Sequence, residues 1–301
     1  MPPHPTAGRG TARVYTRQNQ KNLTSAQRKR FVAAVLELKR NGTYDEFVRT
    51  HDRYFVPDDD DGLRVGHMSP SFFPWHRRYL LEFERALRAL DPGVSVPYWD
   101  WTTDRSPASS LWSEDFMGGT GRESDRRVTT GPFAHDKGNW EIRVGVTEAP
   151  YLTRNLGRPH KPITLPTARE LQWALDDPVY DTAPWDSTAA GGGFRNKLEG
   201  WAAPRSERWR NHNKVHQWIG GHMTGGTAPN DPVFWLHHAF VDLLWDRWQA
   251  RHPRSGYLPA APLGRTDRQR GRVLTRDDPM PPWDVTPAQL LSHKGIYRYE
   301  T

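Results

Sequence analysis

The apolar positions of the first ninety residues recur at helical spacing and predict three helices. A capping-box sequence, TSAQ, opens the first helix, which we expect over 24–42. A second, short helix is expected from about residue 44, and Pro74 opens a third, long one. The apolar face of the second helix includes His51, and that of the third includes His76. The predicted stripe of the third helix consists of His76, Leu80, Phe83, Leu87 and Leu90.

The middle of the chain, residues 91–205, contains proline, glycine and serine throughout. Only two short segments, at about 167–176 and 194–201, show a helical pattern there. We therefore expect long loops that are held in place by buried aromatic side chains such as Trp99.

Two clear helical patterns return near 209–219 and 232–250. For the second of them we expect Asp231 as the N-cap and Pro232 at the first helical position. The chain shows no internal repeat, and no convincing linker separates its helical regions. The pattern therefore predicts a mainly α fold.

We expect a single domain over 14–301, preceded by a flexible leader at 1–13. A chain of 301 residues can bury a large core, and 14 Trp, 11 Phe and 10 Tyr supply much of the burial. No run approaches the roughly 18 apolar residues of a membrane span. The N-terminus lacks the apolar core of a signal peptide. We expect no membrane partner and no export signal of the chain's own.

The net charge of +7 raises the question of nucleic-acid binding. The basic residues are scattered, and the groups at 28–30 and 77–78 fall on what we expect to be outer helix faces. The densest basic stretch, 265–276, lies in a predicted loop without interleaved aromatic residues. A solvated surface explains this charge better than a binding site, so no nucleic-acid partner is expected.

Thirteen histidines stand out in a chain that has no cysteine. A single histidine on an apolar face is more often a satisfied core residue than a metal ligand, but several together need an explanation. Five have proline, glycine or charged neighbours and are expected at the surface: His4, His135, His160, His252 and His293. The other eight form two groups along the chain: His51, His67 and His76, and His212, His216, His222, His237 and His238.

Two members of the second group, His212 and His216, lie four residues apart, so both imidazoles share a helix face and can reach one ion. His51 and His76 occupy the apolar faces of their own helices. Burying several imidazoles without partners costs free energy. A metal ion is the partner that the pattern predicts.

The ligand type narrows the choice of metal. Imidazole suits zinc, copper, iron and nickel, and two tri-histidine zinc sites satisfy the same count. Neither group has a carboxylate at ligand spacing, although dinuclear sites of harder ions usually share one. Neutral ligands suit a pair of Cu(I) ions with room for O2 between them. The residues favour a coupled copper pair, with a zinc protein or a basic binding module as alternatives.

Two motifs give the chain a family resemblance. The spacing H-x15-H-x8-H of the first group, with SPSFFPWHRRYLLEFE around its third histidine, resembles the first copper motif of tyrosinases. HNKVHQWIGG followed by PNDPVFWLHH resembles the second, and the match to the actinomycete bacterial kind covers roughly 14–260. The resemblance implies a type 3 dicopper centre inside an antiparallel four-helix bundle with long aromatic-rich loops. It implies one copper on His51, His67 and His76, and the other on His212, His216 and His238.

The resemblance also implies roles around the two copper ions. Of the adjacent pair it takes His238 as the ligand, which leaves His237 to support the site. His222 is expected at the edge of the site or in a structural role. Phe234 matches an aromatic residue that packs against a copper-bound imidazole.

Asn213 and Glu199 match the pair that holds a water able to deprotonate a phenol, so they are the expected catalytic residues. The segment between Glu199 and His212 is a few residues longer than the family pattern. Gln217 directly follows a predicted ligand, where the resemblance places a residue near the mouth of the site.

The function implied is that of a dicopper oxidase with O2 as co-substrate. It would convert catechols or ortho-aminophenols to quinones or quinone imines, with possible ortho-hydroxylation of monophenols. Alternatives with the same centre are a hemocyanin-like oxygen carrier and a biosynthetic ortho-aminophenol oxidase without monophenolase activity. A small copper-delivery helper (caddie) protein is a possible partner. The chain is then expected in the cytoplasm, or secreted by piggyback on that helper.

Overall fold

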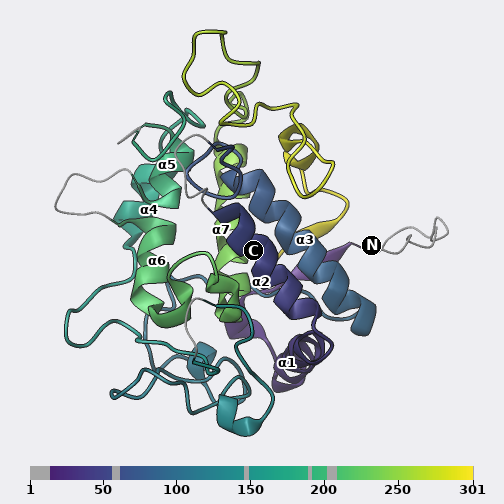
Figure 1. Cartoon of the computed structure of the whole chain (residues 1–301), viewed down its shortest axis with the longest axis vertical. Helices are drawn as coiled ribbons and strands as arrows, with labels where there is room; N and C mark the ends of the chain where they lie inside the picture. Colours follow the sequence, from purple (N-terminus) through teal and green to yellow (C-terminus); the bar gives the residue numbers. More distant parts are fainter. Residues whose placement is uncertain (1–13, 56–61, 146–148, 189–191, 202–208, 301) are drawn as a thin grey trace.

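The computed structural model of the protein describes residues 14–55, 62–145, 149–188, 192–201 and 209–300. The predicted leader, 1–13, lies outside these ranges. Within them the structure is mainly helical, with two short strands, β1 (Tyr15–Arg17) and β2 (Tyr297–Tyr299) (Figure 1). The α-helices are α1 (Ser25–Arg40), α2 (Thr43–Phe55), α3 (Phe72–Leu90), α4 (Ala168–Leu175), α5 (Phe194–Glu199), α6 (Asn211–Ile219) and α7 (Val233–Arg251). The 3-10 helices are η1 (Gln20–Asn22), η2 (Ser110–Trp112), η3 (His135–Lys137), η4 (Gly221–Met223), η5 (Ala228–Asn230) and η6 (Pro287–Leu290).

The helices predicted from the sequence are present, and α1 has the predicted capping box. The Thr24 side chain accepts a hydrogen bond from the Gln27 backbone N–H, and the Gln27 side chain accepts one from the N-cap backbone. α3 begins at Phe72, two residues before the expected Pro74. Proline is tolerated there because the first-turn N–H groups of a helix have no intrahelical acceptor.

The start of α7 differs by one residue from the prediction. Pro232 is the N-cap, and the helix begins at Val233. Asp231 still caps it in part, since its Oδ1 accepts a hydrogen bond from the Val233 N–H at 3.2 Å. The same carboxylate is held by Arg154, whose Nε donates to Oδ2 at 2.6 Å.

Three predictions about burial are wrong. Leu90 is 43% exposed, because α3 ends there beyond the core. Arg77 was expected on an outer face but is fully buried, and its Nε donates to Asp242 Oδ1 at 2.6 Å. His293 was expected at the surface but is buried, with Nε2 2.9 Å from an Asp246 carboxylate oxygen. In the last two cases a distant carboxylate replaces water as the partner.

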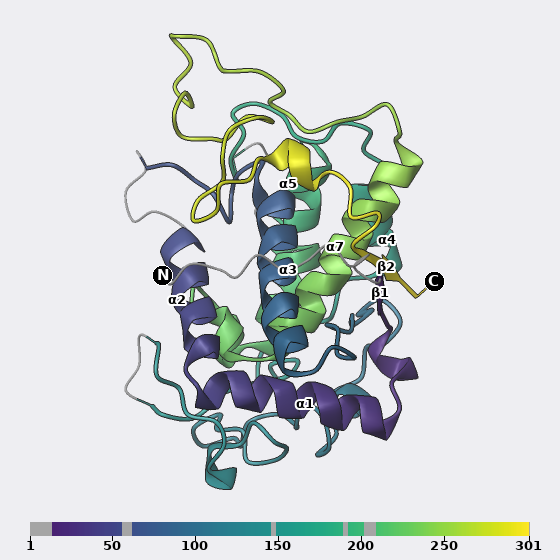
Figure 2. The ribbon, with the colours of Figure 1, turned by 90° about the vertical axis from the view of Figure 1, so that its right-hand side faces the viewer.

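Helices α3 and α7 pack against each other in the middle of the molecule, and α6 packs against α7. Figure 2 shows α2 and α3 side by side, with α1 crossing below them. Seven of the histidines predicted for the site are buried. Six of them lie on α2, α3, α6 and α7, and the seventh, His67, lies in the segment between α2 and α3. The antiparallel order of these four helices stays a prediction of the resemblance.

The long loops between α3 and α6 are anchored by buried aromatic side chains, as predicted. Trp99 and Trp101 are fully buried, and Tyr98 is nearly so. None of the helices in the described ranges is long and apolar enough to span a lipid bilayer.

A buried ionic network ties the two ends of the described chain to α3 and α7. β1 and β2 pair in parallel. Arg17 on β1 donates to Glu84 on α3 at 2.6 Å and to Asp242 on α7 at 2.9 Å. Tyr297 and Tyr299 on β2 also donate to Asp242. Because every member is buried and hydrogen-bonded, the network holds α3 and α7 in one relative position.

Candidate metal centre

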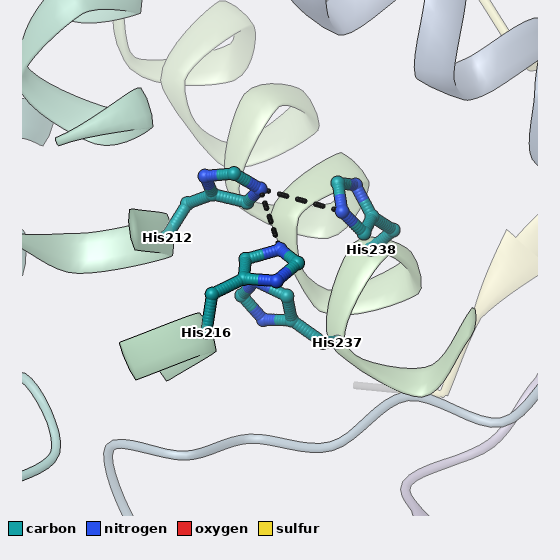
Figure 3. Close-up of side chains that lie close together, drawn as sticks. All are labelled: His212, His216, His237 and His238. Atoms are coloured by element: carbon teal, nitrogen blue, oxygen red, sulfur yellow. Dashed lines mark hydrogen bonds between the residues drawn. The ribbon is translucent and has the colours of Figure 1, made fainter. Parts of the chain in front are cut away.

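Seven buried histidines gather in the middle of the molecule, in two groups. Within each group, one nitrogen atom of every residue lies within 4.8 Å of the others, which is close enough to share a metal ion. The first group is His51, His67 and His76, and the second is His212, His216, His237 and His238. Figure 3 shows the four side chains of the second group lying close together.

Backbone carbonyls orient two of the three imidazoles of the first group, those of His51 and His76. His51 Nδ1 lies 2.5 Å from the Gly226 carbonyl oxygen, and His76 Nδ1 lies 2.8 Å from that of Phe72. A carbonyl only accepts, so each Nδ1 carries the proton and each Nε2 keeps its lone pair. His67 Nε2 lies 3.2 Å from His51 Nε2. His76 Nε2 is buried without a hydrogen-bond partner among the described residues.

Acceptor oxygens orient two of the four imidazoles of the second group, those of His212 and His216. His216 Nδ1 lies 2.6 Å from the Met223 carbonyl oxygen. His212 Nδ1 lies 3.2 Å from the Glu199 carbonyl oxygen and 3.0 Å from Asn213 Oδ1. All three contacts place the proton on Nδ1, and they leave the Nε2 of both residues free to bind an ion.

The Nε2 atoms of the second group converge. His212 Nε2 lies 3.0 Å from His216 Nε2 and 3.3 Å from His238 Nε2, as the dashed lines in Figure 3 show. His237 instead stacks on His212, with ring centroids 5.0 Å apart and planes 18° apart. The His237 ring therefore turns a face, rather than a nitrogen, toward His212. His238 is therefore better placed than His237 to share an ion with His212 and His216.

The two groups form one continuous centre. The rings of His76 and His238 stack with centroids 4.3 Å apart, and those of His67 and His212 lie 5.7 Å apart. The Phe234 ring contacts both groups, with its centroid 4.1 Å from that of His238 and 4.9 Å from that of His51, so the predicted packing of this aromatic residue against an imidazole is present. Ions held by the two groups would be neighbours.

Burial lowers the pKa of these imidazoles, because the charged form loses its hydration. The pKa values of His51, His76, His212, His237 and His238 all lie well below the usual 6.5, and neighbouring histidines lower them further. Burial lowers the pKa of His216 to about 3. The imidazoles are therefore neutral at neutral pH, and a donor set made of neutral imidazoles fits copper.

Glu199 and Asn213 both adjoin this centre. The Glu199 carboxylate accepts hydrogen bonds from the Met68 N–H at 2.7 Å and from Arg195 Nη1 at 2.9 Å, and lies 3.5 Å from His67 Nδ1. Burial raises the Glu199 pKa, but His67, Arg195 and the Met68 N–H together hold it below its usual value, so the group is ionised. Asn213 Nδ2 is buried and has no hydrogen-bond partner in the part that the structure describes.

A cavity of about 80 Å³ opens beside the histidines. Besides four of them it is lined by Phe55, Trp201, Trp209, Asn213, Gln217 and Met223, among others. Glu199 does not line it. The three aromatic residues were not among the predicted site residues, although Trp201 and Trp209 lie within the lengthened segment. Most of that segment, 202–208, lies outside the described residues.

His222 belongs to neither group. Its Nδ1 accepts a hydrogen bond from the Thr153 backbone N–H at 3.0 Å, and it lies 2.9 Å from Thr153 Oγ1. This contact fixes the loop that contains Thr153 against η4. Of the two roles expected for His222, at the edge of the site or in the structure, it therefore has the structural one.

Residues 41–251 match a protein-family model described as the common central domain of tyrosinase. The chain belongs to the tyrosinase family. It is 55% identical over 286 residues to the tyrosinase of Streptomyces glaucescens, covering 95% of this chain and 98% of that protein. It is 44% identical over 316 residues to the grixazone synthase of Streptomyces griseus subsp. griseus, covering 95% and 99%. Among solved structures, a point mutant of the polyphenol oxidase from Thermothelomyces thermophila superposes with a TM-score of 0.68 at 22% identity, covering 96% of this chain and 89% of that one.

These comparisons confirm the family, the fold class and the class of enzyme. Tyrosinase-family proteins are dicopper enzymes that use O2, and the two buried histidine groups of this chain are able to hold two copper ions. The chain is thus a type 3 copper oxidoreductase that acts on phenolic substrates.

Proposed function

We propose that this tyrosinase-family chain oxidises catechols and ortho-aminophenols to quinones and quinone imines, and that it hydroxylates monophenols more slowly. The orientation of the imidazoles supports the proposal most directly. Carbonyl oxygens of Gly226, Phe72 and Met223 hold three Nδ1 atoms, so the Nε2 lone pairs face the centre. Copper bound there supplies the electron transfer to O2. We assign one copper to His51, His67 and His76, and the other to His212, His216 and His238.

The chain's own side chains then position the substrate. Phe55, Trp201 and Trp209 give the cavity an aromatic wall that suits a flat ring and limits the entry of water. The unpartnered Nδ2 of Asn213 and the ionised carboxylate of Glu199 are suited to hold a water molecule that takes the proton of a phenol.

The ranking of substrates follows from that base. A phenol has a pKa near 10, so hydroxylation depends on proton removal, whereas catechols and ortho-aminophenols give up electrons readily. The ion pair with Arg195 weakens Glu199 as a proton acceptor. This ion pair favours ortho-diphenols and ortho-aminophenols over monophenols as substrates. Of the two alternative functions, it favours the ortho-aminophenol oxidase over the oxygen carrier.

Metal analysis and a substrate panel test the proposal. We expect two copper ions per chain and, under air, the intense near-ultraviolet band of an oxygenated dicopper centre. Stoichiometric zinc or iron after growth with copper would contradict it. Catechol, ortho-aminophenols and tyrosine are then compared by initial rate under air, with a lag expected for tyrosine. An oxygen carrier would bind O2 reversibly and form quinone slowly or not at all.

We propose further that a small helper protein delivers the copper, and that the chain stays in the cytoplasm or is exported together with that helper. The burial of the centre supports this, since its seven histidines are at most 9% exposed and copper must enter through a narrow cavity. Copper content per chain, compared between the native host and a host that expresses this chain alone, tests the helper. Immunodetection of the chain in the cells and the culture fluid of both hosts tests its location.

A further inference from the structure

The rim of the cavity carries an amide whose orientation is imposed by an arginine. Gln217, on α6, directly follows His216 and lines the cavity. Its Oε1 accepts a hydrogen bond from Arg158 Nη2 at 2.5 Å. Because this contact occupies the acceptor end of the amide, the N–H donors of Gln217 are left for a ligand.

The arginine is held in place by the backbone rather than by a carboxylate. The turn that contains Arg158 is bonded to the last turn of α6, through the Asn155 N–H to the Ile219 carbonyl and the Gly157 N–H to the Trp218 carbonyl, both at 2.8 Å. Arg158 itself has φ +50°, which is uncommon for a residue other than glycine. Within the described ranges it forms no ion pair with an acidic side chain.

Two other lining residues carry unused hydrogen-bond donors. Trp201 and Asn213 line the cavity, and Trp201 Nε1 and Asn213 Nδ2 are buried without a hydrogen-bond partner among the described residues. No aspartate or glutamate in the described part of the chain lines it. A ligand in this cavity therefore meets donors and a nearby cation, and gains most if it presents an acceptor.

We propose that Arg158 and Gln217 form a subsite for an anionic substituent, a carboxylate carried on the ring of a catechol or an ortho-aminophenol. This rests on the proposed function and names the substrate class within it. The guanidinium and the amide N–H groups would bind the carboxylate by charge-assisted hydrogen bonds while the ring lies against the histidines. Four consecutive aspartates, 58–61, follow Phe55 in the sequence and would favour a cationic substituent instead. The sign of the substrate preference decides between the two.

Three catechols with matched side chains test the sign. 3-(3,4-Dihydroxyphenyl)propanoate, 4-ethylcatechol and dopamine carry a negative, a neutral and a positive side chain on the same ring. With the copper-loaded enzyme at pH 7 and physiological salt, we expect kcat/KM for the carboxylate to exceed that for the ammonium about tenfold, mostly through KM. The ratio should fall toward one in about 1 M salt, where charges are screened within about 3 Å.

Substitutions of Arg158 and Gln217 test whether these two residues cause the preference for the carboxylate over the ammonium. Arg158→Asn removes the charge, and asparagine tolerates the positive φ, so this variant should fold and bring the ratio near one. Arg158→Lys should keep part of the preference. Gln217→Glu places a carboxylate on the rim and should reverse it. Arg254→Asn is the matched control, since Arg254 is an exposed arginine on the segment after α7 and its loss should leave the ratio unchanged.

A wild-type preference for dopamine, or a ratio that survives Arg158→Asn, would overturn the proposal. Equal kcat/KM for all three catechols would refute the subsite and leave the oxidase function intact, whereas oxidation of none of them would refute the function. In that case binding still tests the subsite. Quenching of tryptophan fluorescence by 3-phenylpropanoate on the copper-loaded protein should be several-fold weaker for Arg158→Asn than for wild type. Equal quenching would count against the subsite.

Discussion

Acid should unfold the metal-free protein steeply between about pH 6 and pH 5. Six histidines of the metal centre have pKa values below 6.5 in the fold, because burial disfavours their charged form. In the unfolded chain the same groups have a pKa of about 6.5. The unfolded chain therefore binds more protons, so their contribution to stability is complete above pH 6.5 and is lost as the pH falls below it.

The size of the effect is comparable with the whole stability of a domain. At pH 5.5 each of these histidines favours the unfolded state by about 1.4 kcal/mol, and six of them by about 8 kcal/mol. Typical domains are stable by about 5–15 kcal/mol. Asp181 acts in the opposite direction, because burial raises its pKa to about 6 and the folded state binds that proton first. From these seven groups together we expect a net uptake of about four to five protons on unfolding near pH 5.5.

Urea unfolding of chelator-treated protein at several pH values between 7.5 and 5.0 measures this uptake. The slope of the unfolding free energy against pH, divided by about 1.4 kcal/mol, gives the number of protons taken up. His237→Phe is the matched variant, since it removes one buried imidazole that we do not assign as a ligand and should lower the slope by about one proton. Copper held on the Nε2 atoms competes with protons, so the copper-loaded protein should unfold at lower pH and lose copper and activity together.

An uptake of one proton or fewer would show that the buried histidines do not control acid stability. Unfolding of the metal-free and copper-loaded proteins at the same pH would show that the ions do not bind these imidazoles. Either result would refute the reasoning from burial.

Two further predictions concern individual residues. His238→Ala should lose one copper ion and nearly all activity, whereas His237→Ala should keep most of its copper, because supporting residues typically change metal affinity by about 10–100-fold. Equal copper contents, or the reverse order, would show that the ligand assignment is wrong. Asn213→Ala and Glu199→Gln should depress the initial rate on tyrosine more than the rate on a catechol. An unchanged ratio of the two rates would place the base elsewhere.

The helices that carry the histidines could be predicted because their signals are local. The capping box of α1 lies within four residues, and the α2 face that includes His51 repeats within two turns. The prediction of a metal rested on the same periodicity, which places His212 and His216 on one face of α6. Each signal spans at most a few helical turns, so it can be read without knowing the rest of the fold.

The contacts that complete the centre are not local. The carbonyl that orients His51 belongs to Gly226, 175 residues away in the sequence. The carboxylate that accepts the hydrogen bond of the buried Arg77 belongs to Asp242, 165 residues away. Glu199 was predicted from its place in a motif, but its ion pair with Arg195 depends on how α5 packs.

The sequence by itself therefore determined the helical class and the two histidine groups, and it favoured copper over zinc. Helical spacing and the neutral imidazole donor carry this information. Only the tertiary structure decided which imidazole nitrogen faces the centre, which ring of the adjacent pair brings its Nε2 close to His212, and which arginine donates to Gln217. The reason is that backbone carbonyls fix most of these orientations. Every residue has the same carbonyl, so no pattern of side chains reveals which one a folded chain will use.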